Sequence, residues 1–284
     1  MRKLTISSVR GGLIDLLNDD HFHLVNFDAE TKADVSISSY TVSGYDGDIV
    51  NNIQALPRTA TLELQIKSGV SVEMAKRHIL QVIKPKELCT FTLEQEERKV
   101  QLQGYVETIY MPRYQLGVVM SVGFYCTQPY WEDVVEVFRR LSNIDDLHYF
   151  TTYPNDMLIL PEEGIPLGAY NFERYRQFRN DGDAEVGITI YITAVAKVTN
   201  PVLYADDGTY IGVNTTMEAE DVIIITTHKG NKTITKNGVN ILDTIMAGST
   251  WLQLPTGVNA FNFDSDDEEL DNCYFEIAYK QRYV

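Results

Sequence analysis

Turn-forming dipeptides divide the second half of the chain into short stretches rich in β-branched and aromatic residues. We find these dipeptides at Asp207-Gly208, Lys229-Gly230, Asn237-Gly238 and Thr256-Gly257. Dipeptides of this kind close tight turns between strands. Before them, residues 186–198 predict one long strand, with Ile188, Ile190 and Ile192 on a single face. Short strands with such turns indicate an antiparallel β-sandwich of jelly-roll type.

The first half of the chain predicts strands together with one helix. Residues 61–67 alternate between polar and apolar, which puts Leu62, Leu64 and Ile66 on one face of a strand. A helix of about three turns is then expected to end before Pro85. Its apolar residues at helical spacing are Val72, Ala75, Ile79, Val82 and Ile83. Further strands are expected over residues 88–93, 99–110 and 114–126. We therefore expect a mainly β chain whose N-terminal β-sandwich carries one helix.

The boundary between two predicted domains, residues 1–135 and 136–284, lies near residues 128–131, where Pro129 stops the preceding strand. The charge balance changes there as well. Residues 1–135 hold 13 basic and 17 acidic residues, a net charge of −4, whereas residues 136–284 hold 11 and 23, a net charge of −12. We predict one domain on each side, with Pro129, Tyr130 and Trp131 at their junction.

Composition and charge argue against several classes of protein. With a net charge of −16 and no long basic run, the chain is not expected to bind nucleic acid tightly. Its longest apolar runs, such as residues 222–225, are too short to cross a bilayer. The N-terminus lacks the apolar region of a signal peptide. We expect a folded protein that is made in the cytoplasm and does not insert into membranes.

The segment between Tyr40 and Arg58 combines turn residues at its start with apolar residues afterwards. Turn residues dominate its start, and exposed connections of this length rarely hold many apolar residues without a role. One interpretation is a floppy hairpin tip. We favour an arm that packs on a neighbouring subunit. The candidate interface residues are Tyr45, Ile49, Val50, Ile53 and Leu56.

Two groups of residues could hold a metal ion. His21 and His23 have a spacing that places both imidazoles on one face of a strand, but no third zinc ligand is close in sequence. A surface or interface histidine pair is the favoured interpretation. The carboxylates of residues 264–271 could attract calcium, yet the EF-hand spacing and its glycine are missing. A solvated acidic loop is expected there, and no cofactor is expected in the chain.

No motif predicts a catalytic site. Cys89, Cys126 and Cys273 could act as nucleophiles with His148 or His228, but isolated cysteines are more often buried and inert, and these are expected to be reduced. Adjacent carboxylates also occur, as expected by chance in an acidic chain. They are Glu162-Glu163, Asp145-Asp146 and Asp206-Asp207. A glycosidase would need one of two carboxyls with a raised pKa, which no motif indicates.

Four blocks, taken in order along nearly the whole chain, resemble the distal tail proteins of siphophages and related prophage tails. The first is Gly44-Tyr45-Asp46-Gly47, with Leu56-Pro57-Arg58 opening the next strand. The second is the helix ending Ile83-Lys84-Pro85, and the third is the stretch of residues 124–131. The fourth comprises Asn200-Pro201, Asp207-Gly208-Thr209-Tyr210-Ile211, Asn237-Gly238-Val239-Asn240, Leu254-Pro255-Thr256-Gly257-Val258-Asn259 and the closing strand at residues 275–279.

The resemblance implies a structural protein and not an enzyme. In this family the first domain forms a hexameric belt below the tail tube, and the second is a galectin-like jelly-roll sandwich that faces outward. The implied partners are further copies of the chain, the tail tube protein, a tail-tip or tail-associated lysin-type protein, and receptor-binding proteins. The implied location is the virion tail, assembled in the host cytoplasm.

Two other functions stay open from the sequence. One is a lectin-like protein that binds cell-wall carbohydrate, and the weaker one is a glycoside hydrolase on a sandwich scaffold. A stand-alone lectin would not need a first domain with strands, a helix and an exposed arm. The residues expected to form an exposed aromatic cluster in the second domain are Tyr149, Phe150 and Tyr153, and the only tryptophans are Trp131 and Trp251.

Overall fold

The chain folds into two units. The computed structural model describes residues 2–30, 34–44, 46–96, 98–112, 118–141, 143–145, 169–171, 175–266 and 272–284. Unit 1 comprises residues 1–135 and 282–284, and unit 2 comprises residues 136–281. The last three residues, which the sequence analysis assigned to the second domain, thus lie in unit 1. No helix in the described ranges is long and apolar enough to cross a membrane.

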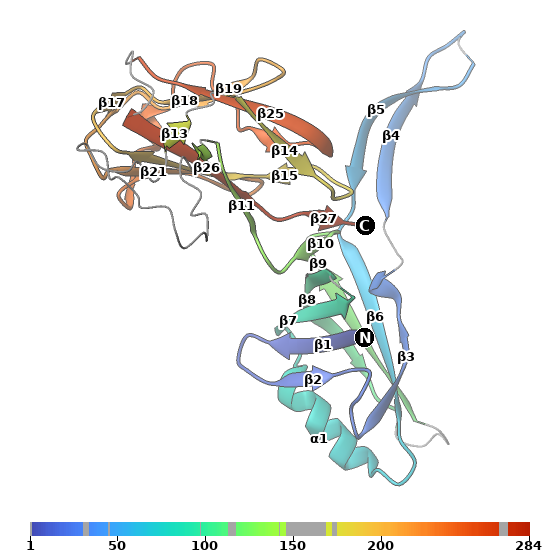
Figure 1. The fold of residues 1–284 in the computed structure, drawn as a ribbon. Coiled ribbons are helices and arrows are strands. Elements are labelled where there is room, and N and C mark those ends of the chain that lie inside the picture. The colour runs from blue at the N-terminus through green and yellow to red at the C-terminus, as the bar shows by residue number, and fades with distance from the viewer. Residues whose placement is uncertain are drawn as a thin grey trace, which may run out of the picture. The chain divides into compact units, whose positions relative to one another are not determined.

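Unit 1 is built on one nine-stranded antiparallel sheet (Figure 1). Its main path runs β2-β1-β7-β8-β9-β6-β3, and β10 joins β8 to β27. The bounds are β1 (Lys3–Ser8), β2 (Leu13–Asp15), β3 (Phe22–Phe27), β6 (Arg58–Ile66), β7 (Leu88–Gln95), β8 (Arg98–Tyr110), β9 (Val119–Cys126), β10 (Trp131–Asp133) and β27 (Arg282–Tyr283). Residues 114–117 of the strand expected over 114–126 lie outside the described residues.

The inward face of β6 supplies the centre of the unit 1 core. Leu62 and Leu64 are fully buried, and their partners across the strand pair, Val122 and Met120 of β9, are buried with them. Phe91 of β7 packs among other rings, with centroids 4.6 Å from Phe27 and 4.8 Å from Phe124. These contacts follow from the period-two alternation of the sequence.

The single predicted helix is present as α1 (Val72–Val82), between β6 and β7. Its buried residues, Ala75, Ile79 and Val82, lie on one stripe as the helical spacing requires. Ser71 occupies the N-cap position in an extended conformation, although its side chain makes no capping hydrogen bond. Within unit 1, the helix packs beside β1 and β2 (Figure 1).

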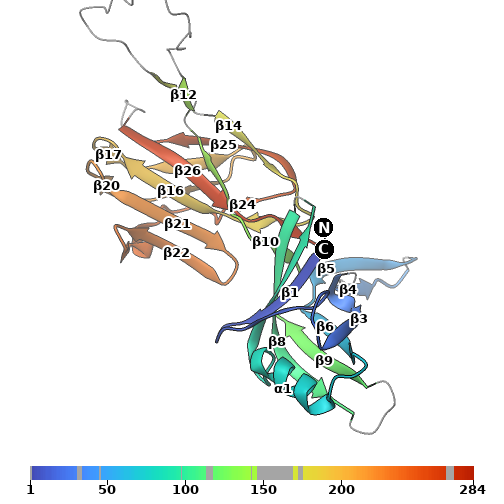
Figure 2. The ribbon, with the colours of Figure 1, turned by 60° about the horizontal axis from the view of Figure 1, so that its bottom comes forward.

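Unit 2 is an antiparallel sandwich of two sheets. The larger sheet has the order β11-β26-β16-β21-β22-β23 and the smaller one β14-β25-β18-β19; the central strands of the larger sheet lie side by side in Figure 2. The larger sheet comprises β11 (Val137–Arg140), β26 (Cys273–Tyr279), β16 (Thr189–Ala194), β21 (Val222–His228), β22 (Asn231–Lys236) and β23 (Val239–Asn240). The smaller comprises β14 (Tyr175–Asn180), β25 (Gly257–Asp264), β18 (Val202–Ala205) and β19 (Tyr210–Gly212). Short pairs flank them: β12 (Asn143–Asp145) with β13 (Ala169–Asn171), β15 (Val186–Gly187) with β24 (Gln253–Leu254), and β17 (Val198–Thr199) with β20 (Thr216–Met217). A 3-10 turn, η2, spans Leu242–Thr244.

The two sheets of unit 2 share one core. Ile190 and Phe275 of the larger sheet are fully buried, as are Phe261 and Phe263 of the smaller one. The rings of Phe263 and Phe275 stack with their centroids 4.8 Å apart. The prediction of a mainly β chain with one helix is therefore confirmed.

The predicted Asn237-Gly238 turn joins β22 to β23. Both residues have positive φ, 49° and 81°, and Lys236 pairs with Val239 across them. A two-residue hairpin of this kind needs left-handed backbone at both central positions, which asparagine and glycine tolerate best.

The long strand expected over residues 186–198 is interrupted. Thr227 is fully buried, and its hydroxyl accepts a hydrogen bond from the Ile188 amide at 2.9 Å and donates one to the Ile188 carbonyl at 3.1 Å. A side chain thus takes part in the pairing at Ile188, so β15 pairs with β24 while β16 pairs with β21. Alternation alone cannot reveal a side-chain contact of this kind.

We expect Phe91→Ala to destabilise unit 1 by about 3–5 kcal/mol, because it removes a ring from a closed aromatic cluster and leaves a cavity. Guanidinium unfolding in a Trp251→Phe background leaves Trp131 of unit 1 as the only tryptophan and so reports on this unit. Tyr110→Ala is the control, since Tyr110 is 62% exposed, and its effect should be within about 0.5 kcal/mol. Equal losses in the two variants would contradict this description of the core.

Candidate functional site

Strands β4 (Val35–Thr41) and β5 (Asp48–Ala55) form a hairpin that pairs only with itself among the described residues. We call residues 35–55 the arm hairpin. It leaves unit 1 between β3 and β6 (Figure 1). The Leu56 amide donates to the Asp34 carbonyl at 2.9 Å and closes its base. Near the turn, the Thr41 and Ser39 hydroxyls donate to the Asp48 carboxylate at 2.8 and 3.2 Å.

The register of the arm hairpin separates its side chains into two faces. Ile37 lies opposite Ile53, and the register shifts between Ser38 and Ser39. Because side chains alternate along a strand and paired residues share a face, one face carries mostly apolar residues. They are Val35 and Ile37 on β4 with Val50, Ile53 and Ala55 on β5. The other face is polar near the base, with the pairs Ser36–Gln54 and Ser38–Asn52, and becomes apolar at Tyr40–Ile49.

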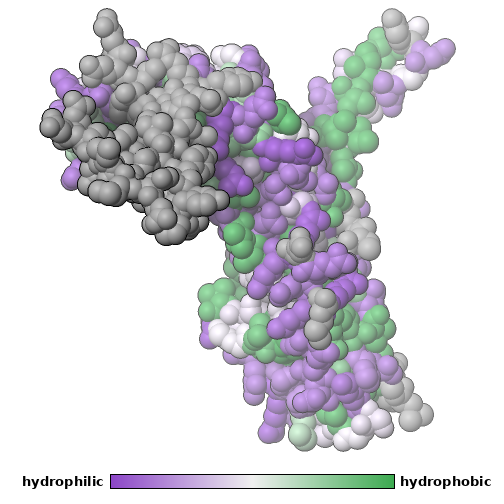
Figure 3. All heavy atoms as spheres, in the orientation of Figure 1, coloured by the Kyte–Doolittle hydropathy of each residue, from purple (hydrophilic) through white to green (hydrophobic). Residues whose placement is uncertain are grey.

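Both faces of the arm hairpin are open in the isolated chain. Ile37 and Ile53 are 62% and 63% exposed, and hydrophobic residues line the arm in Figure 3. A lone two-stranded hairpin is at best marginally stable in water. An exposed apolar face of this kind is typical of a protein–protein interface.

A buried contact anchors the base of the arm hairpin. Arg58, the first residue of β6, is 2% exposed and donates from its guanidinium to the carbonyl of Ala29, in the short turn η1 (Asp28–Glu30) before β4. The indole of Trp131 donates to the same carbonyl at 3.1 Å. Asp28 accepts from the Thr61 amide at 2.5 Å. The segments that enter and leave the arm are thereby held together.

Arg58 keeps its charge at this buried position although the net shift of its pKa is downward. Burial lowers the pKa of the guanidinium, while the neighbouring Cys126 thiol and the carboxylates of Asp28 and Asp34 raise it. Because the ordinary pKa of arginine is far above neutrality, Arg58 stays a cation. Its Nη1 donates to the Ala29 carbonyl, while Nε and Nη2 are buried without a hydrogen-bond partner among the described residues. Loss of the Ala29 acceptor would therefore leave a buried cation still less satisfied, so this contact holds its surroundings in place.

The structure brings together most of the residues predicted for the arm. Val50 and Ile53 share the apolar face, Ile49 lies on the other face, and Leu56 follows β5. All four are exposed. Tyr45 lies outside the described residues.

The sequence analysis missed strand β4, and with it Val35 and Ile37. Period-two alternation with Ser36 and Ser38 is present in the sequence and could have identified this strand.

The three residues predicted at the domain junction lie near the end of unit 1. Trp131 is buried in the unit 1 core, where its ring meets Phe27 edge-on at 6.4 Å, and Pro129 and Tyr130 are half-buried. Trp131 pairs with Tyr283 in the β10–β27 ladder. A role of these residues at the junction stays a prediction.

The candidate nucleophiles are poorly suited to catalysis. Cys89, Cys126 and Cys273 are all free and buried. Burial raises the pKa of the Cys89 thiol to about 12 and that of Cys126 to about 11. Thiols with such pKa values carry almost no thiolate at neutral pH and are weak nucleophiles. His148 lies outside the described residues.

Unit 2 has a pocket of about 300 Å³ beside Trp251. Its lining includes Glu185, Asp206, Asp207 and Asn259. The Thr209 hydroxyl and amide donate to Asp207 and lower the pKa of its carboxyl, which is the opposite of what a glycosidase acid requires.

Several further candidates lie outside the described residues. They are Asp146, Tyr149, Phe150, Tyr153, Glu162, Glu163 and residues 267–271 of the acidic loop.

A comparison with known protein families matches part of the second half of the chain. Residues 181–283 match the family described as siphovirus-type tail component, C-terminal domain. A comparison with curated protein sequences found no significant match.

Solved structures match along the whole chain. The crystal structure of SPP1 Dit, described as a paradigm of the hub adsorption apparatus in phages that infect Gram-positive bacteria, is 14% identical with a TM-score of 0.69 and covers 99% of each chain. Structures of the phage p2 baseplate in its activated conformation, with Ca and with Sr, are 14% identical with TM-scores of 0.48 and 0.45, covering 99% of this chain and 98% of theirs. The chain thus carries a siphovirus-type tail component domain at residues 181–283 and has the fold of SPP1 Dit throughout, which confirms its resemblance to the siphophage distal tail protein family.

Proposed function

We propose that this tail component is the distal tail protein of a phage or prophage tail and forms a ring, which is a hexamer as the family resemblance implies. The ring joins the tail tube to the tail tip and anchors host-recognition proteins, without an enzymatic role. Its partners are further copies of the chain, the tail tube protein, a tail-tip or tail-associated lysin-type protein and receptor-binding proteins. The tail that they form is assembled in the host cytoplasm. The observation that carries the proposal is the exposed apolar face of the arm hairpin.

The arm hairpin supplies part of the energy that ring assembly requires. Burying a valine or isoleucine fully stabilises by about 1.5–3 kcal/mol, so half-burial of Val35, Ile37, Val50 and Ile53 contributes roughly 3–6 kcal/mol per interface. Association costs roughly 4–15 kcal/mol, so other surface must join the contact. The end strands of the unit 1 path, β2 and β3, present edges that a neighbour can pair with.

The ring is expected to depend on the apolar face of the arm. Ile53→Asp places a charge in the buried interface, so it should turn rings into monomers. Sedimentation velocity at the highest soluble concentration, followed by negative-stain microscopy, distinguishes six-lobed rings from single subunits. Because Ile53 is exposed, the free energy of unfolding should change by no more than about 0.5 kcal/mol.

Gln54→Asp is the matched control for this experiment. It introduces the same charge on the neighbouring residue of β5, on the polar face of the arm hairpin. Rings should survive in this variant. The proposal fails if both variants assemble equally well, in solution or on purified tail tubes, or if Ile53→Asp unfolds the subunit.

A lectin-like function is the second candidate, and the pocket beside Trp251 is the observation that favours it. An indole next to carboxylates and an amide can bind a sugar ring. The proposal as a structural subunit instead predicts no saturable binding of cell-wall polysaccharide in calorimetry with the full chain. Binding that saturates in the micromolar range and is lost in Trp251→Ala would establish the lectin and assign the pocket as its site.

A further inference from the structure

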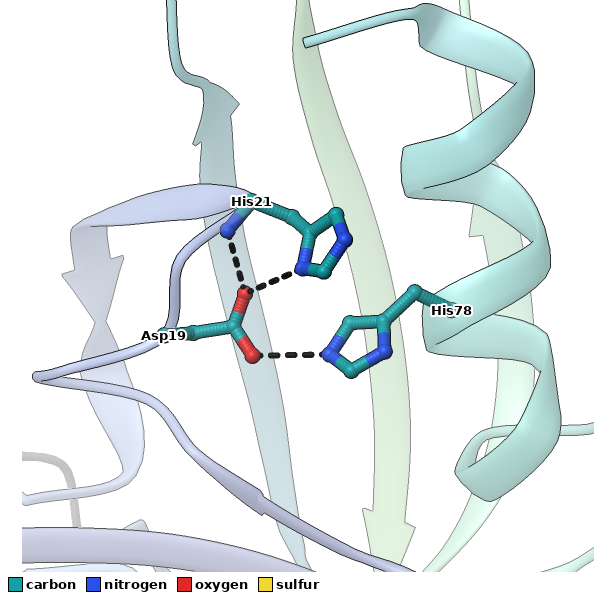
Figure 4. A group of neighbouring side chains, drawn as sticks. All are labelled: Asp19, His21 and His78. Atoms are coloured by element: carbon teal, nitrogen blue, oxygen red, sulfur yellow. Dashed lines mark hydrogen bonds and ion pairs between the residues drawn. The ribbon is translucent and has the colours of Figure 1, made fainter.

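Asp19, His21 and His78 form a compact cluster in unit 1 that the tail function does not use (Figure 4). Asp19 and His21 come from the turn before β3, and His78 comes from α1. The Asp19 carboxylate lies 2.7 Å from Nε2 of His78 and 3.4 Å from Nδ1 of His21. It also accepts from the His21 amide at 2.8 Å. His23, the partner expected for His21, is exposed and is not part of the cluster.

The donor set and its spacing suit a divalent cation. One oxygen and two imidazole nitrogens, all within 4.8 Å of one another, can converge on a single point. Zinc takes such ligands at bond lengths of about 2.0–2.2 Å, and tetrahedral geometry then separates ligand atoms by roughly 3.3–3.5 Å. The Asp19–His21 separation of 3.4 Å already has this value. The shorter Asp19–His78 contact needs to open by less than 1 Å by this estimate.

A second observation points to a missing ligand. Nδ1 of His21 is buried and makes no hydrogen bond in the described part of the chain, and the Asp19 carboxylate at 3.4 Å is only a long ion-pair contact. A buried polar atom without a hydrogen bond costs about 1–3 kcal/mol. The two imidazole rings stack with centroids 4.2 Å apart, which holds this nitrogen beside His78. A cation between the three residues would satisfy it.

The two histidines of the cluster are accessible to solvent. The side chains of His21 and His78 are 28% and 29% exposed, so solvent can reach the site and a water molecule can supply the fourth ligand. The Lys67 ammonium lies close, but it is hydrogen bonded to the main-chain carbonyl of Asp19 at 2.7 Å. The Asp19 carboxylate is therefore not used by this lysine.

We propose that Asp19, His21 and His78 form a zinc-class divalent cation site that ties α1 to the turn before β3. Bound metal links two segments that are far apart in the sequence and so stabilises unit 1. The competing explanation is a purely structural histidine–aspartate cluster that binds no metal.

Zinc titration of chelator-treated full-length protein tests the proposal. Calorimetry should find one zinc per chain, and zinc should raise the unfolding temperature because it binds only the folded state. Cobalt in place of zinc should give the intense visible absorption of a four-coordinate site. Asp19→Asn and His78→Ala should each weaken zinc binding by about tenfold or more.

Two further variants separate metal binding from folding. His78→Gln keeps a side-chain donor for Asp19 but is a poor zinc ligand, so it should retain the metal-free unfolding temperature and lose the rise caused by zinc. His23→Ala removes an exposed histidine outside the cluster and should bind zinc like the wild type. Absence of saturable binding below about 1 mM zinc, or equal binding by wild type and His78→Gln, would overturn the proposal.

Discussion

The carbonyl oxygen of Ala29 accepts hydrogen bonds from both the Arg58 guanidinium and the Trp131 indole. This shared acceptor connects the turn that enters the arm hairpin, the strand that leaves it and the end of unit 1. A buried cation without its acceptors would cost several kcal/mol. The base of the arm is therefore fixed by the core, even though the two strands of the arm pair only with each other among the described residues. A rigid base lets an exposed hairpin meet a neighbour with little loss of conformational entropy.

The same part of the fold also receives the last residues of the chain. After the sandwich of unit 2, β27 pairs with β10 through Tyr283 and Trp131, and Arg282 forms an ion pair with Glu132 at 2.7 Å. Two connections thus join the units, one on each side of residues 136–281.

Local patterns predicted much of this fold. The alternation around Leu62 and Leu64, the helical spacing of Ala75, Ile79 and Val82, and the Asn237-Gly238 turn all gave elements that the structure contains. These features depend on a residue's near neighbours, so one sequence is enough to read them. The exposed apolar residues Val50 and Ile53 were identified for the same reason.

Contacts between distant residues could not be predicted in this way. The break in the strand at Ile188 depends on the side chain of Thr227. Strand β27 belongs to unit 1 because it pairs with β10. His78 joins His21 only because α1 packs beside the turn before β3, so the sequence pattern suggested His23 instead. The sequence alone did not assign Ile37 to the apolar face of the arm, because that assignment depends on its pairing with Ile53.

Hydrogen exchange of the arm amides, in the free subunit and in assembled tails, tests most directly whether the arm is an assembly surface. In the free chain, residues 35–55 should exchange quickly, because this hairpin is marginal on its own. In the assembly their exchange should slow by about tenfold or more, while the β22–β23 hairpin at residues 231–240 of unit 2 serves as an internal reference. Arm amides that exchange equally fast in both states, alongside protection elsewhere in unit 1, would contradict the account.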